Sequence, residues 1–302
     1  MNNDEHLSIN LEDKIDLKEL FSVFWSGKIK ILLITAIFAI SSVMYSLSLP
    51  NQYKATAILA PSTGGVSDTF SRLGGFASFA GISLNESSSG NDARLAIEIM
   101  QSWSFIEDFI AENNLAPMLF AVEGWEEQEN KIIFNNDIYD AKNNNWINEG
   151  ELPSSWDLFQ SFTGKLSVED DKRSGLTIVT IEYISPQIAK NWVDLYVSSI
   201  NKYMQARKIQ MVSKNIEYLD EQVVGNSNSE MKEVFFAIIS EQVKEKMMAE
   251  ATPDYAFVTV SPSMVPEKKS QPNRALICIL GTIVGGIFSI FLVLILHYGR
   301  NN

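Results

Sequence analysis

Paired carboxylates are the residues of this 302-residue chain whose type could support catalysis. Asp170 and Asp171 are neighbours, as are Glu126 and Glu127. Two carboxylates at a suitable separation form the acid–base machinery of a glycosidase. Both pairs lie in charged stretches, where carboxylates are ordinarily solvated surface groups. A glycan hydrolase therefore stays open as an alternative interpretation of the sequence.

Other catalytic and binding chemistries find little support in the composition. The two histidines, His6 and His297, lie near opposite ends of the chain, and Cys278 is the single cysteine. The stretch 164–166 reads Gly-Lys-Leu and lacks the Ser or Thr of a phosphate-binding loop. The formal net charge of −13 argues against a nucleic-acid partner. We expect no catalytic, cofactor-binding or metal-binding residues.

Two uncharged apolar stretches, residues 31–49 and 275–296, must position everything between them. At 1.5 Å per residue the second would form a helix about 33 Å long, enough to cross the hydrocarbon core of a bilayer. The first starts late for a cleaved signal peptide and has no Ala-x-Ala-like site. Both are therefore predicted to be transmembrane helices, preceded at 16–25 by a short amphipathic helix suited to the membrane interface.

The charges around the two spans predict their orientation. Four lysines between positions 14 and 30 precede the first span, and Arg300 follows the second. Under the positive-inside rule, this places residues 1–30 and the tail 297–302 in the cytoplasm. The intervening domain, residues 50–274, would then be periplasmic in a bacterium. We expect an inner-membrane protein in contact with membrane lipid.

The domain between the spans is predicted to be an α+β fold. Alternating and β-branched residues predict strands at 52–61, 166–169, 176–184 and 255–260. Helical periodicity indicates two shorter helices within 91–113 and another after Pro153. Neither the Gly/Ser-rich segment 62–90 nor the acidic segment 122–152 contains a motif that assigns it a role.

A long helix at about 186–224 and a return helix at about 230–251 are predicted to form a projecting hairpin. Apolar or small residues recur along the first helix with a mean spacing of 3.5, typical of a narrow seam that packs on another helix. That helix could come from this chain or from a neighbouring copy, and we expect a homo-oligomer. The larger side chains of this predicted oligomer seam are Trp192, Tyr196, Ile200, Tyr203, Ile209, Val212, Ile216 and Leu219.

The approach to the second span contains two further candidate features. Three prolines lead into it, and each fixes its own φ angle and keeps its predecessor out of the helical region. They are Pro262, Pro266 and Pro272. Within the span, small residues at four-residue spacing allow close approach of another helix. The candidates for this contact are Gly281, Gly285 and the adjacent Gly286.

The order of these features resembles the chain-length determinant proteins of the Wzz family (class 1 polysaccharide co-polymerases). The resemblance is carried by Ile-Asp-Leu-x-Glu-Leu at 15–20 with Trp25 before the first span, and by Tyr-x-Ala-x-Ala at 53–57 after it. The proline-containing approach to a Gly-bearing second span completes it. The proline spacing is looser than the family's dense proline run.

The resemblance implies an α+β base domain near the inner membrane, a long projecting helix and ring-like homo-oligomers. It further implies a non-enzymatic regulator that sets the modal length of O-antigen made by a Wzy-type polymerase. The polymerase is then a partner, and the growing lipid-linked polysaccharide is a further candidate partner.

Several alternatives remain open. The chain could serve another surface polysaccharide, such as a capsule, an exopolysaccharide or a common antigen. A tyrosine autokinase of capsule export would need a cytoplasmic phosphate loop and a Tyr-rich tail, and only six residues follow position 296. A two-span sensor would need a cytoplasmic output domain. We expect neither a kinase nor a sensor.

Overall fold

A computed structural model describes residues 17–62, 88–148, 150 and 152–301. The chain divides into two compact units, one made of residues 1–51 and 271–302 and the other of residues 52–270. Most of the predicted loop at 62–90 lies outside the described residues.

An antiparallel sheet organises the larger unit. Its central strand β1 (Gln52–Pro61) pairs with β7 (Leu176–Tyr183) on one side and with β8 (Phe257–Ser261) on the other. Among the described residues the order is β6-β7-β1-β8, with β6 (Leu166–Asp171) at one edge and β9 (Lys269–Gln271) also paired to β1. Alternate side chains of β1 are buried, as the period of two along a strand requires.

Four short helices pack against this part of the chain, and two small β-hairpins lie between the third and the fourth of them in the sequence. The helices are α3 (Ser88–Met100), α4 (Trp103–Glu112), α5 (Ala116–Phe120) and α6 (Ser155–Thr163). The small strands are β2 (Val122–Glu126), β3 (Lys131–Phe134), β4 (Tyr139–Asp140) and β5 (Asn145–Trp146). Strand β2 pairs with β3 and β4 with β5, so the acidic segment 122–152 contains regular structure despite its polar composition.

An aromatic cluster forms the centre of the core. The rings of Phe109 and Tyr196 meet edge to face with centroids 4.9 Å apart, and Phe162 packs on both. The Tyr196 hydroxyl donates to the carbonyl of Met100, so the buried phenol is satisfied. Burial raises the pKa of Tyr196 well above its ordinary value. This cluster holds α4 and α6 against the first half of the longest helix.

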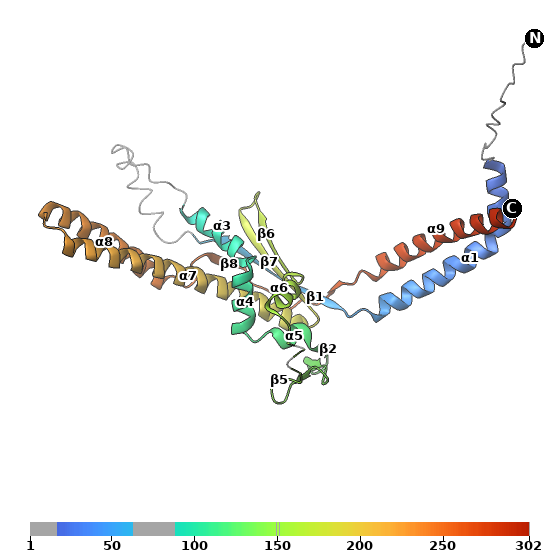
Figure 1. The fold of residues 1–302 in the computed structure, drawn as a ribbon, viewed down its shortest axis with the longest axis horizontal. Coiled ribbons are helices and arrows are strands. Elements are labelled where there is room, and N and C mark those ends of the chain that lie inside the picture. Colours follow the sequence, from blue (N-terminus) through green and yellow to red (C-terminus); the bar gives the residue numbers. More distant parts are fainter. Residues whose placement is uncertain (1–16, 63–87, 149, 151, 302) are drawn as a thin grey trace, which may run out of the picture. The chain divides into compact units, whose positions relative to one another are not determined.

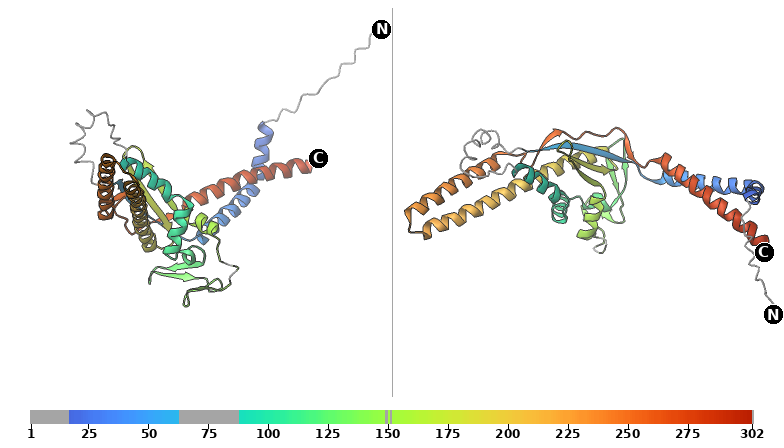
Figure 2. Two further views of the ribbon diagram at one scale, coloured as in Figure 1. Left: turned by 60° about the vertical axis from the view of Figure 1, so that its left-hand side comes forward. Right: turned by 90° about the horizontal axis from the view of Figure 1, so that it is seen from above.

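That longest helix, α7 (Pro186–Gly225), forms a hairpin with α8 (Ser229–Ala251). Ser185 caps α7 by accepting the N–H of Ile188, and Pro186 occupies the first turn, where its missing N–H costs nothing. Both helices lie within a residue of the sequence-based bounds. Their outer parts run side by side beyond the sheet (Figures 1 and 2). The α+β class with a projecting helical hairpin is thus confirmed.

The smaller unit is a pair of apolar helices, α1 (Leu17–Ser48) and α9 (Arg274–Asn301). The predicted spans 31–49 and 275–296 lie almost wholly inside them. The expected separate amphipathic helix at 16–25 is wrong, because α1 continues unbroken through Gly27. An isolated glycine is tolerated within a helix at a cost of about 1 kcal/mol, so it does not end α1 here.

Candidate functional sites

The paired helices α1 and α9 are the first candidate site. Two segments, Gly27–Ser48 and Arg274–Leu296, are long and apolar enough to cross a membrane. Most of their apolar side chains face outward, whereas a core helix of a soluble protein is mostly buried. The two helices therefore have the character of a membrane-spanning pair.

Two glycines of α9 lie directly against α1. A Cβ atom built on Gly281 would lie 2.5 Å from Ser42, and one built on Gly285 would lie 2.4 Å from Phe38. Gly286 is different, since a Cβ there would meet nothing within 4 Å. The structure thus brings Gly281 and Gly285 to the helix contact and leaves Gly286 off it.

Polar contacts extend the same interface. Ser42 Oγ donates to the carbonyl of Ile277 over 3.0 Å, and the hydroxyls of Thr35 and Ser289 lie 3.3 Å apart. The residue nearer the end of α1, Ser42, pairs with the residue nearer the start of α9, Ile277, while Thr35 pairs with Ser289 further along α9. The two helices are therefore antiparallel. The small-residue face of α9 is consequently occupied by this chain's own α1. Contact of these glycines with another subunit or with a polymerase stays a prediction.

The proline approach is tied back to the sheet before α9 begins. After Pro262, Ser263 is buried and its hydroxyl donates to the carbonyl of Lys190 over 3.2 Å. Strand β9 then pairs with β1, and the Ser270 hydroxyl donates to the carbonyl of Gln52. The segment between Pro262 and Pro272, which contains Pro266, is therefore tied to the larger unit.

The α7 seam serves two different contacts within the chain. Its inner members, Trp192, Tyr196 and Ile200, are at most 3% exposed and belong to the core of the larger unit. Such side chains have no surface left to bury against a second copy. This corrects their assignment to an oligomer seam. Tyr203 lies at the margin of the core, where its ring meets Phe105 edge to face at 5.5 Å.

The outer members of the seam lie where α7 packs along α8. Val212 is fully buried, and Ile209, Ile216 and Leu219 are half-buried. Polar pairs run along the same contact, including an ion pair between Lys208 and Glu245 at 3.0 Å. The sequence left open whether the seam would meet this chain or a neighbour, and the structure shows the return helix of the same chain. A role of these residues in assembly stays a prediction.

Asn201 is a structural residue that the periodicity did not single out. It is buried, its Oδ1 accepts the N–H groups of Ala256 and Phe257 at 3.0 and 2.9 Å, and its Nδ2 donates to the carbonyl of Phe257. One amide thereby fastens the root of the hairpin to the start of β8. The only signal in the sequence was a polar residue adjacent to an apolar seam position.

One carboxylate pair lies at the end of β6 and the other at the end of β2. Asp171 is half-buried at the end of β6, where hydrogen bonds from the Ser174 hydroxyl and the Arg173 backbone N–H lower its pKa. A general acid needs the opposite shift. Glu126 and Glu127 are exposed. Within the described ranges no three His, Cys, Asp or Glu residues are grouped so as to hold a metal ion.

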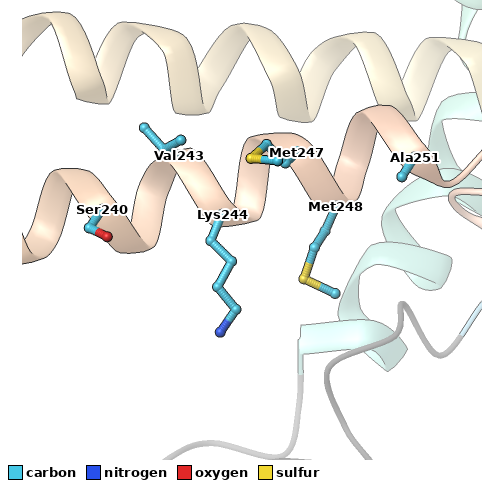
Figure 3. A pocket seen from close by; sticks show the side chains of 6 residues that line it. All are labelled: Ser240, Val243, Lys244, Met247, Met248 and Ala251. Carbon is cyan, nitrogen blue, oxygen red and sulfur yellow. The ribbon is translucent and has the colours of Figure 1, made fainter.

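A shallow groove of about 470 Å³ runs along α8 (Figure 3). Its lining is apolar apart from a serine hydroxyl and one ammonium group. The lining residues are Ser240, Val243, Lys244, Met247, Met248 and Ala251. None of the described residues that line it is a carboxylate, and the groove offers mainly apolar contact area.

Residues 13–113 match the family model described as chain length determinant protein, Wzz. The match spans the first apolar helix, β1 and α3 to α4, and it confirms the resemblance found in the sequence. A search of curated proteins found no match.

Two solved structures are similar to the chain. The first is a full-length bacterial polysaccharide co-polymerase, with a TM-score of 0.42, 14% identity, and coverage of 95% of this chain and 99% of that one. The second is a fragment of WzzB, a polysaccharide co-polymerase from Salmonella Typhimurium, with a TM-score of 0.29, 12% identity, and coverage of 73% and 100%.

Proposed function

We propose that this protein sets the modal chain length of O-antigen, a surface polysaccharide attached to lipopolysaccharide, without catalysing polymerisation. The Wzz-family match over residues 13–113 carries the proposal, since this family determines polysaccharide chain length. The choice of O-antigen over a capsule, an exopolysaccharide or a common antigen follows the family resemblance.

Several observations support a non-enzymatic role. Asp170, Glu126 and Glu127 are exposed, and the lowered pKa of Asp171 runs against acid catalysis. The α8 groove is open and apolar. The larger unit consists mainly of a long helical hairpin and a sheet that holds the base of this hairpin. Such a scaffold can position other components of a synthetic complex.

We place the protein in the bacterial inner membrane with both termini in the cytoplasm and residues 50–274 in the periplasm. The antiparallel α1–α9 pair supports this, because two antiparallel spans return the chain to its starting side. Trp25 is exposed with the Lys28 ammonium 4.6 Å from its ring centroid, a combination suited to the lipid headgroup region. A ring-like homo-oligomer acting on a Wzy-type polymerase is the expected working form.

The test is the electrophoretic ladder of surface polysaccharide from strains with and without the gene. Loss of the protein should replace a modal cluster of lengths with a broad distribution, while the polymer is still made. An unchanged ladder would refute the proposal. The purified protein should release no reducing sugar from the polysaccharide. Release that is lost on heating but retained after Asp170→Asn and Asp171→Asn would indicate hydrolysis by other residues and would overturn the non-enzymatic role.

A further inference from the structure

Two half-exposed tryptophans stand together on neighbouring helices of the larger unit. Trp103 begins α4 and is 46% exposed, while Trp156 lies in the first turn of α6 and is 48% exposed. Their rings meet edge to face with centroids 5.5 Å apart, and Phe159 lies against both at 5.6 and 6.3 Å. Exposed indoles of this size are costly to leave in water unless something covers them.

We propose that Trp103 and Trp156 form a platform that binds neutral sugar rings of the polysaccharide whose length the protein sets. The inference rests on the proposed function and adds to it a direct contact between protein and polymer. The ligand class is a pyranose with an apolar C–H face, because such a face stacks on an aromatic ring while the hydroxyls remain available for hydrogen bonds.

The platform is held rigidly before any ligand arrives. The indole N–H of Trp103 donates to Ser155 Oγ over 2.8 Å, which joins the two helices beside the rings. Ser102 caps α4, and Ser154 caps α6 through a reciprocal capping box with Asp157. On their other faces, α4 and α6 bury Phe105, Phe109 and Phe162 in the core. Little side-chain freedom is left to lose on binding.

The chemistry around the rings favours a polyhydroxylated and uncharged ligand. The residue four positions after each tryptophan shares its helix face, and these residues are Glu107 and Gln160, both exposed. Carboxylate and amide oxygens accept hydrogen bonds from hydroxyl groups, and the amide also donates. Because the Trp103 N–H donates to Ser155, the exposed part of that indole consists of the ring face and its C–H edge.

Charge selects among the possible occupants. Neither α4 nor α6 contains Lys or Arg, while the two helices present Glu107, Asp108 and Asp157 on exposed positions. A nucleic acid, an acidic glycan or an anionic membrane surface would be repelled there. Neutral sugar rings meet none of these penalties.

The experiment measures binding of the lipid-free surface polysaccharide of the producing strain to the full chain in nanodiscs of neutral lipid. The double variant Trp103→Ala/Trp156→Ala should bind at least about tenfold more weakly, the loss typical of truncated aromatic anchors. The control variant Phe236→Ala, which truncates another exposed aromatic (56% exposed, on α8), should stay within about twofold of the wild type. Dextran serves as a neutral comparator and polygalacturonate as an anionic one.

A folding defect is separated from a lost contact by a second variant. Glu107→Ala changes only an exposed side chain and should weaken polysaccharide binding about threefold with an unchanged melting curve. Wild-type affinity in both the double variant and Glu107→Ala, or no binding by the wild type, would overturn the platform. The platform would also be overturned if the double variant kept its polysaccharide affinity and changed only in oligomer mass or lipid binding.

The ladder separates the two proposals. If deletion of the gene broadens the ladder but the double variant gives both a normal ladder and normal binding, the platform is wrong and the length-setting function stands. If deletion leaves the ladder unchanged, the proposed function is wrong. The binding measurement then still decides the platform by itself.

Discussion

Asn201→Ala is expected to destabilise the larger unit by about 3 kcal/mol. The change removes the acceptor of two buried backbone N–H groups, those of Ala256 and Phe257, and the donor to the Phe257 carbonyl. Each buried group left without a partner costs about 1–3 kcal/mol. The sum falls toward the lower end because water can enter the space left by the amide and satisfy part of the loss.

The assay is urea unfolding of the full chain in detergent, followed by tryptophan emission. Five of the six tryptophans lie between residues 52 and 270, so the signal reports chiefly on that unit. With a slope of about 1–3 kcal/mol per molar, the midpoint should fall by about 1–3 M.

The matched control for Asn201 is Asn215→Ala, on the same helix. Asn215 is exposed and makes a single 3.4 Å contact to Gln242, so its loss should cost no more than about 0.5 kcal/mol. Equal midpoints for the wild type, Asn201→Ala and Asn215→Ala would show that the buried amide does not fasten the hairpin root.

Three further predictions concern the helix pair, a half-buried carboxyl and the hairpin ion pair. Gly285→Leu should lengthen the distance between spin labels at positions 35 and 289 in a cysteine-free background, whereas Gly286→Leu should not, because only the first would clash with α1; equal distances would contradict the contact. Burial raises the pKa of Asp92, so its ionised form is penalised in the folded state. Asp92→Asn should therefore stabilise the protein at pH 7, and the gain should fade as the pH falls through the raised pKa toward 3.8; a gain that is the same at pH 3 and pH 7 would count against this. Lys208→Ala should cost about 0.5 kcal/mol at low salt and less in 1 M salt, since its ion pair is partly exposed; a salt-independent loss would indicate packing instead.

The helical hairpin was predictable because its signal is local. A 3.5-residue spacing without Pro or Gly up to Gly225 is sufficient to predict a long helix, and the polar turn that follows predicts its end. What covers a seam is a tertiary property. Trp192 and Ile209 follow the same spacing, yet one is core and the other faces α8. Periodicity shows that a face is buried without showing what buries it.

The tryptophan platform was beyond prediction for a related reason. Fifty-two residues separate Trp103 from Trp156 in the sequence. The two rings come together only because α4 and α6 pack against each other and bury Phe109 and Phe162 in the core. Asn201 was missed because a polar residue beside a seam is usually solvated. Its partners, Ala256 and Phe257, lie at the start of β8, more than fifty positions along the chain.

In the proposed function, this chain sets polymer length without making polymer. The most direct measurement is the total amount and the length distribution of surface polysaccharide in a null strain that carries the gene under an inducible promoter. Induction should convert a broad distribution into a modal cluster while the total amount of repeat units stays constant. A strain that makes no polymer until the gene is induced, or one whose distribution never changes, would contradict the claim.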